Sequence, residues 1–405
     1  MPITDNTDDG PTAASNQSAE FNTGRVLTVS AAHGVHDTYT AFLPSLLPVF
    51  IASFALSNTQ AGLLTVFLQI PSLLQPFIGH LADRISLRRL VILAPAVTAA
   101  MMSLLGVAPS YAVLALLLTV AGASSASIHA VGPVMTGRLA GESLGRGMGF
   151  WMVGGEAGRT LGPLVIVTAI QFLTPSGTPW LMVAGLVMSV LLFFLLRDAV
   201  GRQSSAVEPL PWSQALRSLG PLLLPLIGLI VSRSFMVSAL TTYLPTFLSG
   251  EGVGLFVAGA SLSILEGAGV AGALVGGWLS DRFGRRVILL TSMTGTPLLM
   301  FAFLLVTDWL RVPLLLPMGF LALSVGPVLM ALVQETSPES PALANGVYMA
   351  LSFIIRSGVI ILVGGLGDLF DLRVAFAVSA AITLLGLPVV LLLPPTPSGQ
   401  AEALS

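Results

Sequence analysis

The sequence predicts an all-α membrane protein in which twelve transmembrane helices form two pseudo-symmetric six-helix bundles. Of the 405 residues, 54% are hydrophobic and 9% are charged, and the mean hydropathy is +0.91. Soluble domains carry about 25% charged residues, so this composition excludes an ordinary soluble fold. Apolar runs of about 20 residues, the length that a helix needs to cross roughly 30 Å of hydrocarbon, recur along the chain. The runs lack a two-residue alternation, which favours helical spans.

Breaks at Gly, Pro, Ser and charged clusters divide the chain into twelve predicted spans. The first bundle, residues 25–197, is predicted to hold spans 26–52, 58–82, 88–108, 110–137, 145–171 and 178–197. The second bundle, residues 218–394, is predicted to hold spans 218–248, 255–280, 287–306, 310–335, 342–367 and 373–393. Residues 198–217 form a polar segment that we predict to be a cytoplasmic linker, with a short surface helix near 212–219. Residues 1–24 and 395–405 are predicted cytoplasmic tails, the first of them disordered because it is polar and acidic.

The arginines indicate the orientation of the spans. All seventeen basic residues are arginines, and only Arg311 and Arg373 would face outside if both ends of the chain are cytoplasmic. By the positive-inside rule, we expect a multi-pass protein of the cell (inner or plasma) membrane with both termini in the cytoplasm. The arginines that would flank the cytoplasmic ends are Arg25, Arg84, Arg88, Arg89, Arg138, Arg146, Arg197, Arg202, Arg217, Arg282, Arg285 and Arg286.

Two short motifs occur once in each half of the chain. The segment "GHLADRISLRR" follows the second span and "GGWLSDRFGRR" follows the eighth, which places Asp83 and Asp281 198 residues apart. The first span contains "TAFLP" and the seventh "TTYLP", with Pro44 and Pro245 separated by 201 residues. Two six-helix halves related by such a shift predict parallel repeats with a substrate site at the midplane of their interface.

With these motifs the chain resembles the major facilitator superfamily over all twelve spans. The second copy matches the signature G-x-x-x-D-R-x-G-R-R, and the first copy departs from it at Ser86, where a glycine is expected. The resemblance implies that acid and arginines of the motif latch the cytoplasmic ends of neighbouring helices. The predicted latch residues are Gly79, Asp83, Arg84, Arg88, Gly277, Asp281, Arg282, Arg285 and Arg286.

A narrower resemblance is to the fosmidomycin-resistance branch of drug efflux proteins. It rests on four segments: "HGVHDTYTAFLPSLLP", "SASIHAVGPVMTGRLAG", "GFWMVGGEAGRTLGPL" and "LVQETSPESPALANGVYMALSF". This resemblance implies an alternating-access antiporter that exports a small drug-like compound. The chain departs from the branch after His129, where Ala130 stands in a stretch that would usually include an acidic residue.

Ionisable residues near the bilayer centre are costly and therefore candidates for function. His33 and Asp37 are four residues apart on one helix face and could titrate together near neutral pH, as a proton carrier must. We predict proton coupling by His33, Asp37, His129 and Glu156. A hydrogen bond between helices that only fixes the packing is the alternative for His33 and Asp37. For His129 a packing role is equally open, and for Glu156 a permanent ion pair with Arg159.

The arginines in the middle of the spans predict an anion site. Arg356 follows Arg159 by 197 residues, close to the repeat separation, so the two side chains are expected to face each other as a clamp for phosphonate or carboxylate. Arg233 and Glu266, on adjacent spans, could instead form a structural pair. The predicted substrate-binding residues are Arg159, Arg356, Arg233, Tyr39, Tyr243 and Glu266.

The sequence favours a secondary transporter over an enzyme. It contains no cysteine, no phosphate-binding loop and no H-E-x-x-H motif, so we expect no cofactor and no metal site. The net charge of -2 does not suggest nucleic-acid binding. The expected partners are a small-molecule substrate, protons and the lipid bilayer, with a monomer implied by the resemblance. Two alternatives are proton-coupled uptake of an organic anion or nutrient by the same fold, and a membrane receptor that transports nothing.

Overall fold

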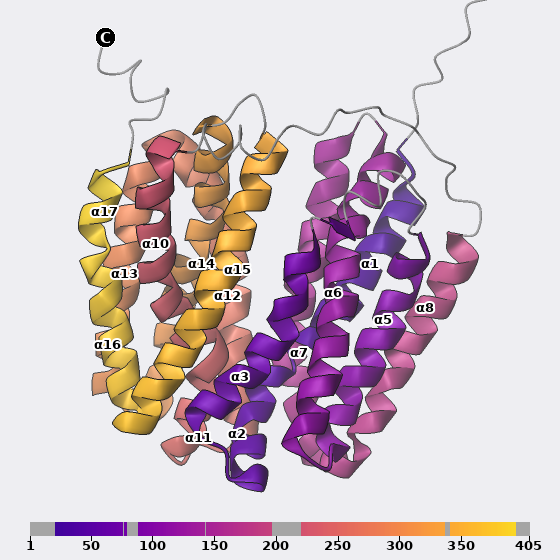
Figure 1. The fold of residues 1–405 in the computed structure, drawn as a ribbon, viewed down its shortest axis with the longest axis horizontal. Coiled ribbons are helices and arrows are strands. Elements are labelled where there is room, and N and C mark those ends of the chain that lie inside the picture. Colours follow the sequence, from indigo (N-terminus) through magenta and orange to yellow (C-terminus); the bar gives the residue numbers. More distant parts are fainter. Residues whose placement is uncertain are drawn as a thin grey trace, which may run out of the picture.

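The computed structural model describes residues 21–75, 77–78, 88–141, 143–196, 220–336 and 341–393, and the regular structure of these residues is helical. Figure 1 shows two bundles side by side, one coloured indigo to magenta and the other orange to yellow. The predicted central linker, with its surface helix near 212–219, and both predicted tails fall almost wholly outside the described residues.

The first bundle comprises the helices up to residue 195. Its elements are α1 (Thr23–Thr40), α2 (Leu43–Phe54), α3 (Asn58–Gln69), η1 (Ile70–Leu74), α5 (Arg88–Ser103), η2 (Leu104–Val107), α6 (Tyr111–Ala140), α7 (Leu144–Leu173), η3 (Pro175–Leu181) and α8 (Met182–Leu195).

The second bundle repeats the arrangement of the first. Its elements are α10 (Gly220–Ser238), η4 (Ala239–Tyr243), α11 (Leu244–Gly250), α12 (Leu255–Phe283), α13 (Arg285–Leu305), η5 (Asp308–Leu310), α14 (Arg311–Thr336), α15 (Pro341–Leu369), α16 (Leu372–Leu385) and α17 (Leu387–Leu391). Taken together with the short turns that join them, these elements make up the twelve predicted spans.

Within the described residues, nine of the spans are long and apolar enough to cross a membrane. The other three are the first, second and fifth. The first span, α1 followed by α2, carries His33 and Asp37, and the fifth, α7, carries Glu156 and Arg159. The second span runs into residues outside the described ranges. The first and fifth spans thus each carry two of the ionisable candidates, whereas His129, Arg233, Glu266 and Arg356 lie on spans that are apolar enough to be among the nine.

The first and seventh spans are interrupted at equivalent places in the repeat. α1 ends at Thr40 and α2 begins at Leu43, one residue before Pro44. In the second bundle the π-helical turn η4 ends at Tyr243, two residues before Pro245. Proline lacks a backbone N–H and disturbs the preceding helical turn, and π turns are frequent at functional sites.

Close packing of α1 against α7 depends on glycine. A Cβ atom on Gly154, Gly158 or Gly162 would lie 2.2–2.4 Å from a backbone oxygen of α1. The three glycines are four residues apart and so form one stripe along α7. This small-residue spacing lets the two backbones approach closely, which fixes α1 and its polar residues relative to α7.

The bundles contact each other between α7 and α12, between α3 and α15, and between α2 and α11. We call the end at which α3 begins and α15 ends the α3 end; it is the lower end in Figure 1. The opposite end, where α12 ends and α13 begins, is the α13 end. At the α3 end, Glu251 accepts hydrogen bonds from Arg373 (2.8 Å) and Arg311 (3.2 Å). These bonds hold the pKa of Glu251 below its usual value.

The second copy of the repeated motif joins three helices at the α13 end. Arg285 on α13 forms ion pairs with Asp281 on α12 (2.5 Å) and Glu335 on α14 (2.7 Å). Gly284 has φ of 87°, a conformation that glycine adopts readily and that the turn between α12 and α13 requires. Arg286 donates to the backbone carbonyl groups of Leu391 and Leu393.

For the remaining predicted latch residues the structure shows fewer contacts. Gly277 lies on α12, and the Arg282 guanidinium lies over the Trp278 ring at 5.8 Å. In the first copy, Arg88 donates to the carbonyl oxygen of Leu196 (2.9 Å). Three other predicted latch residues lie outside the described residues: Gly79, Asp83 and Arg84.

Candidate functional site

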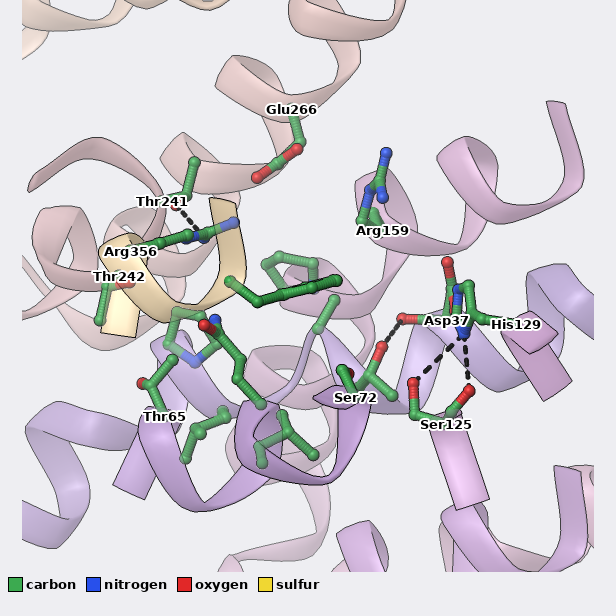
Figure 2. Close-up of a pocket in the computed structure, with 18 of the residues that line it drawn as sticks. Asp37, Thr65, Ser72, Ser125, His129, Arg159, Thr241, Thr242, Glu266 and Arg356 are labelled. Atoms are coloured by element: carbon green, nitrogen blue, oxygen red, sulfur yellow. Dashed lines mark hydrogen bonds and ion pairs between the residues drawn. The ribbon is translucent and has the colours of Figure 1, made fainter. Parts of the chain in front are cut away.

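A cavity of about 300 Å³ lies between the two bundles and brings half of the predicted proton-coupling and substrate-binding residues together (Figure 2). Its walls come from α1 to η1, α6 and α7 of the first bundle, and from η4, α12 and α15 of the second. Asp37, His129, Arg159, Glu266 and Arg356 all line it. The other polar residues of the lining are Thr40, Thr65, Gln69, Ser72, Gln75, Ser125, Thr241 and Thr242. Because both bundles form the walls, a bound solute would touch both.

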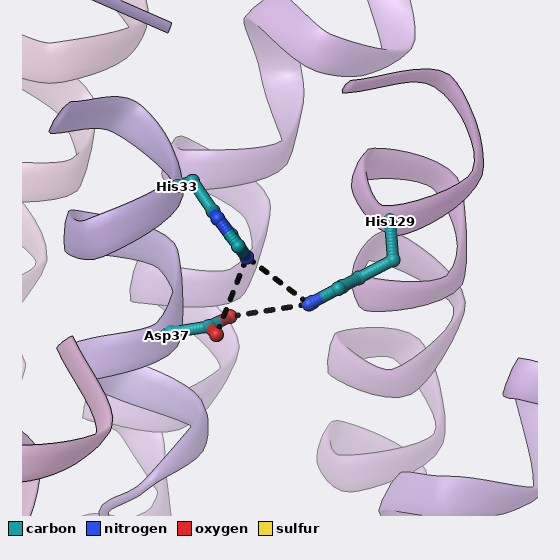
Figure 3. Close-up of side chains that lie close together, drawn as sticks. All are labelled: His33, Asp37 and His129. Carbon is teal, nitrogen blue, oxygen red and sulfur yellow. Dashed lines mark hydrogen bonds and ion pairs between the residues drawn. The ribbon is translucent and has the colours of Figure 1, made fainter. Parts of the chain in front are cut away.

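The side chains of His33, Asp37 and His129 converge, as Figure 3 shows, and the last two line the cavity. His33 Nε2 lies 3.2 Å from His129 Nε2 and 3.3 Å from Asp37 Oδ2. His129 Nε2 lies 3.6 Å from Asp37 Oδ1. The three donor atoms all lie within 4.8 Å of one another, close enough to share one small cation, whether a proton or a metal ion. The sequence predicted the His33–Asp37 contact from its spacing, and it left a contact between the spans of His33 and His129 open beside a packing role for His129.

The outer nitrogens of the two imidazoles are held by backbone carbonyl groups. His33 Nδ1 lies 2.9 Å from the carbonyl oxygen of Trp151, and His129 Nδ1 lies 2.9 Å from that of Ser125. A carbonyl oxygen only accepts hydrogen bonds, so both Nδ1 atoms carry a hydrogen and, in the neutral rings, both Nε2 atoms carry a lone pair. If Asp37 is ionised, the three side chains point only acceptors at one another. The cluster therefore needs at least one additional proton or another cation.

Burial makes that requirement stricter. Asp37 is 3% exposed and His33 is 4% exposed, so these two side chains have little contact with water. The side chain of His129 is 31% exposed and lines the cavity, which gives the cluster one edge that water can reach. His36 is fully buried, with Nε2 3.9 Å from Asp37 Oδ1, too far for a hydrogen bond.

Trp151 and Gly155 on α7 fix the ring of His33. The Trp151 indole stacks on the His33 ring at 3.8 Å between centroids with an interplanar angle of 11°. A Cβ atom on Gly155 would lie 2.4 Å from His33 Cε1, so only glycine leaves room for the ring. Neither residue was singled out from the sequence, because a tryptophan and a glycine in an apolar span give no signal of a polar neighbour.

Replacing Gly155 with Ala is therefore expected to displace the His33 ring and to disturb pH-dependent function. Overpacking of this kind costs about 1–3 kcal/mol of stability. Gly149→Ala is the matched control, because a Cβ at Gly149, also on α7, has nothing within 4 Å. Thermal unfolding of the detergent-purified variants would check the stability. If Gly155→Ala unfolds as late as Gly149→Ala and keeps the same pH dependence, the close fit around His33 is unimportant.

Arg159 forms the predicted ion pair with Glu156, three residues earlier on α7. The side chain of Arg159 is 46% exposed because it projects into the cavity, whereas that of Glu156 is 16% exposed. Asp37 and Glu266 also attract Arg159 electrostatically. Arg159 thus lies between the carboxylate that holds it and the cavity that a solute would enter.

Arg356 approaches the same cavity from α15, on the other side from Arg159 (Figure 2). Its Nη2 donates to Thr241 Oγ1 on the π-helical turn at 2.9 Å, and its buried Nε makes no hydrogen bond within the described residues. Glu266 on α12 attracts both Arg356 and Arg159. The two arginines that the sequence predicted as a clamp do line one cavity from opposite bundles.

The structure places three other predicted substrate residues elsewhere. Tyr39 is buried in the first bundle and donates to the carbonyl oxygen of Leu181. Arg233 donates to the carbonyl oxygen of Ala322 (3.4 Å), and that bond replaces the pairing with Glu266 that the sequence left open. Tyr243 is fully buried and points to the contact between α3 and α15. None of the three is among the described residues that line the cavity. Aromatic or basic character within a span does not reveal which way the side chain points.

Comparison with known proteins identifies similar transport proteins. The model of the Major Facilitator Superfamily matches residues 29–359. The Fosmidomycin resistance protein of Escherichia coli (strain K12) is 25% identical over 390 residues, which cover 93% of this chain and 94% of that protein. An uncharacterized MFS-type transporter of Bacillus subtilis (strain 168), YfnC, is 25% identical over 375 residues, covering 89% and 91% of the two chains.

Two solved structures share the fold at low sequence identity. A bacterial homolog of the human lysosomal transporter Spinster, in an inward-facing and unoccupied conformation, has a TM-score of 0.72 at 17% identity, covering 93% of this chain and 99% of that chain. A D-xylose-proton symporter has a TM-score of 0.71 at 17% identity, with the same two coverages.

Proposed function

Because this chain belongs to the major facilitator superfamily, we propose that it is a proton-coupled secondary transporter that exports a small anionic or amphipathic drug-like compound by alternating access. In this proposal the substrate occupies the cavity between the bundles, and rocking of the bundles exposes that cavity to one side of the membrane at a time. Transport of this kind needs no enzymatic step.

The single observation that carries the proton coupling is the cluster of His33, Asp37 and His129. Its converging atoms are all acceptors unless a proton or another cation is bound, and Asp37 and His129 line the cavity. The charged or titratable groups that face Asp37 are His33 and His36 on α1, His129 on α6 and Arg159 on α7. A proton on this cluster cancels the charge of Asp37 and so changes the field at Arg159.

Glu156 is the second proposed proton site. When Glu156 is ionised, it holds Arg159 in an ion pair, and when it takes a proton, Arg159 can bind a substrate anion instead. Proton binding thereby redistributes the bonds of Arg159 among Glu156, Asp37 and the substrate. Proton binding at these sites shifts the balance between the two conformations only if one conformation binds the proton more tightly than the other.

Arg159 and Arg356 support an anionic substrate. Two guanidinium groups on opposite walls can bind a phosphonate or carboxylate from both sides, and each forms paired hydrogen bonds that lysine would not. Glu266 attracts both arginines in the absence of substrate. We propose that an entering anion replaces Glu266 as their counter-charge. The apolar part of the compound would rest on Leu68, Leu262, Met349 and Phe353, which complete the lining.

The orientation follows from the arginines. We propose that the α13 end, with Arg282, Arg285 and Arg286, faces the cytoplasm and that the α3 end, with Arg311 and Arg373, faces outward. Both termini would then be cytoplasmic, the protein would reside in the cell membrane, and a monomer would contain the whole site.

The direction of transport separates two candidate functions. Similarity to a protein named for fosmidomycin resistance supports export. One feature of the site favours the alternative, uptake of an organic anion together with a proton: an anion bound near Asp37 stabilises a proton there, so the two would tend to bind together. Direction depends on which conformation binds the proton, so it must be measured.

Everted membrane vesicles with an acidic lumen distinguish these candidates. The probes are a simple carboxylate and fosmidomycin, the phosphonate in the name of the similar Escherichia coli protein. The buffer contains a metal chelator. Export predicts that the probe accumulates in the lumen as protons leave, and that accumulation stops when the gradient is collapsed. Uptake predicts that a preloaded probe leaves the lumen with the protons. Equal fluxes with and without the protein would contradict both transport functions and favour the receptor.

A further inference from the structure

Asp368 joins the two bundles at the α3 end. It lies at the end of α15 in the second bundle and accepts hydrogen bonds from the start of α3 in the first. Its carboxylate receives the backbone N–H of Asn58 at 2.6 Å, the backbone N–H of Thr59 at 3.0 Å and the hydroxyl group of Thr59 at 2.6 Å. A carboxylate from one bundle thus completes a helix end of the other.

The start of α3 is arranged so that it needs this carboxylate. The first N–H groups of a helix have no partner within the helix. Ser57 and Gln60 form a capping box, in which Ser57 Oγ accepts from Gln60 N (3.2 Å) and Gln60 Oε1 accepts from Ser57 N (3.0 Å). That box leaves the N–H groups of Asn58 and Thr59 without a partner in α3, and both donate to Asp368. The partial positive charge of a helix N-terminus further favours a carboxylate there.

Tyr243 makes a second contact between the bundles at the same end. Its hydroxyl group lies 2.9 Å from the carbonyl oxygen of Ile360 on α15 and 3.2 Å from that of Asn58 on α3. A Cβ on Gly62 of α3 would lie 2.1 Å from this hydroxyl oxygen, and one on Gly364 of α15 would lie 2.5 Å from it. Tyr243 therefore fills a slot that two glycines leave open, one in each bundle.

The side-chain contacts at the opposite end differ. Among the described residues, the ion pairs of Arg285 with Asp281 and Glu335 all lie within the second bundle. By contrast, the bonds that Asp368 makes to α3 and the contact of Tyr243 with Asn58 must break whenever the bundles separate at the α3 end, whereas the bond of Tyr243 to Ile360 lies within the second bundle. Separation would return the exposed carboxylate and the two N–H groups to water.

We propose that Asp368 and Tyr243 form the gate that closes the α3 end of the cavity, and that the bond between Asp368 and the start of α3 sets how often this gate opens. The inference rests on the proposed alternating access but not on a particular substrate, on protons or on the direction of transport. Tyr243, which the sequence predicted as a substrate contact, becomes a gate residue in this account.

Distances between spin labels test the gate directly. The chain has no cysteine, so Ser53→Cys on α2 and Phe370→Cys beyond α15, both exposed, place one label on each bundle near the α3 end. In this background Asp368→Ala is expected to raise the ratio of separated to closed molecules about fivefold or more, the factor expected from losing a side-chain helix cap. Tyr243→Phe, which keeps the ring and removes the hydroxyl group, is expected to shift the ratio in the same direction by less.

Asp371→Ala is the matched control. Asp371 also caps a helix, accepting from Val374 N at 2.7 Å, but its bond lies within the second bundle. Its loss is expected to leave the distance distribution unchanged. The gate is overturned if Asp368→Ala and Tyr243→Phe give the wild-type distribution, or if Asp371→Ala shifts it equally. Since no probe compound is needed, a shifted distribution with no vesicle flux would count against the proposed function alone.

Discussion

Replacing Asp37 with Asn is expected to abolish transport driven by a pH gradient while leaving exchange of substrate across the membrane. An asparagine has the shape of the aspartate but carries N–H donors, so it can satisfy the lone pair on His129 Nε2 without a proton. The cluster would then resemble its protonated form at every pH. We expect gradient-driven flux to fall to the level of vesicles that lack the protein, because the cluster can no longer take up and release a proton.

The measurement compares two fluxes in the same vesicles. One is accumulation of labelled probe driven by an imposed pH gradient, and the other is exchange of labelled for unlabelled probe without a gradient. Asp371→Asn, which neutralises a carboxylate at the helix cap outside the cavity, should keep both fluxes. Retention of gradient-driven accumulation by Asp37→Asn would remove Asp37 from the coupling mechanism.

Replacing Arg356 with Gln is expected to weaken binding of an anionic substrate by about 10- to 150-fold, the worth of a hydrogen bond to a charged group. The effect should be large because Arg356 has no carboxylate within ion-pair distance among the described residues, whereas Arg159 is already paired with Glu156. Arg356→Lys should restore part of the affinity, because it keeps the charge but loses the planar pair of donors.

Arg233→Gln is the control for Arg356→Gln. Arg233 is also a membrane arginine of the second bundle, but it donates to Ala322 and is not among the described lining residues. Calorimetric titration of the purified variants with a phosphonate at fixed pH and ionic strength gives the affinities. If Arg233→Gln loses as much affinity as Arg356→Gln, the loss reflects general damage to the second bundle and not an anion site.

Contacts set by local spacing were predictable from the sequence. His33 with Asp37 and Glu156 with Arg159 follow from separations of four and three residues on a helix, and the structure shows both contacts. The number of spans followed from the apolar runs and the breaks between them, and the opposition of Arg159 and Arg356 followed from the repeat. The corrections concern side chains whose direction depends on packing between helices, namely Tyr39, Tyr243 and Arg233.

Three features had no signal in the sequence. The carbonyl oxygen of Trp151 fixes the tautomer of His33 across 118 residues of chain. Asp368 reads as an ordinary polar residue at the end of a span, and only the placement of α3 beside α15 reveals its role. The importance of Gly155 lies in the space that it leaves for the His33 ring, and this is visible only when the neighbouring helix is in place.

The most direct test of the central claim, that proton and substrate binding are linked through the cluster in the shared cavity, is the pH dependence of substrate affinity. Titration of the purified wild-type protein with a simple carboxylate, which stays ionised between about pH 6 and 8, should show affinity changing by up to about tenfold per pH unit, as expected for one linked proton. The dependence should become clearly weaker in Asp37→Asn, in which Glu156 is the one proposed proton site that remains. An affinity that stays constant across this range in the wild-type protein would contradict the account.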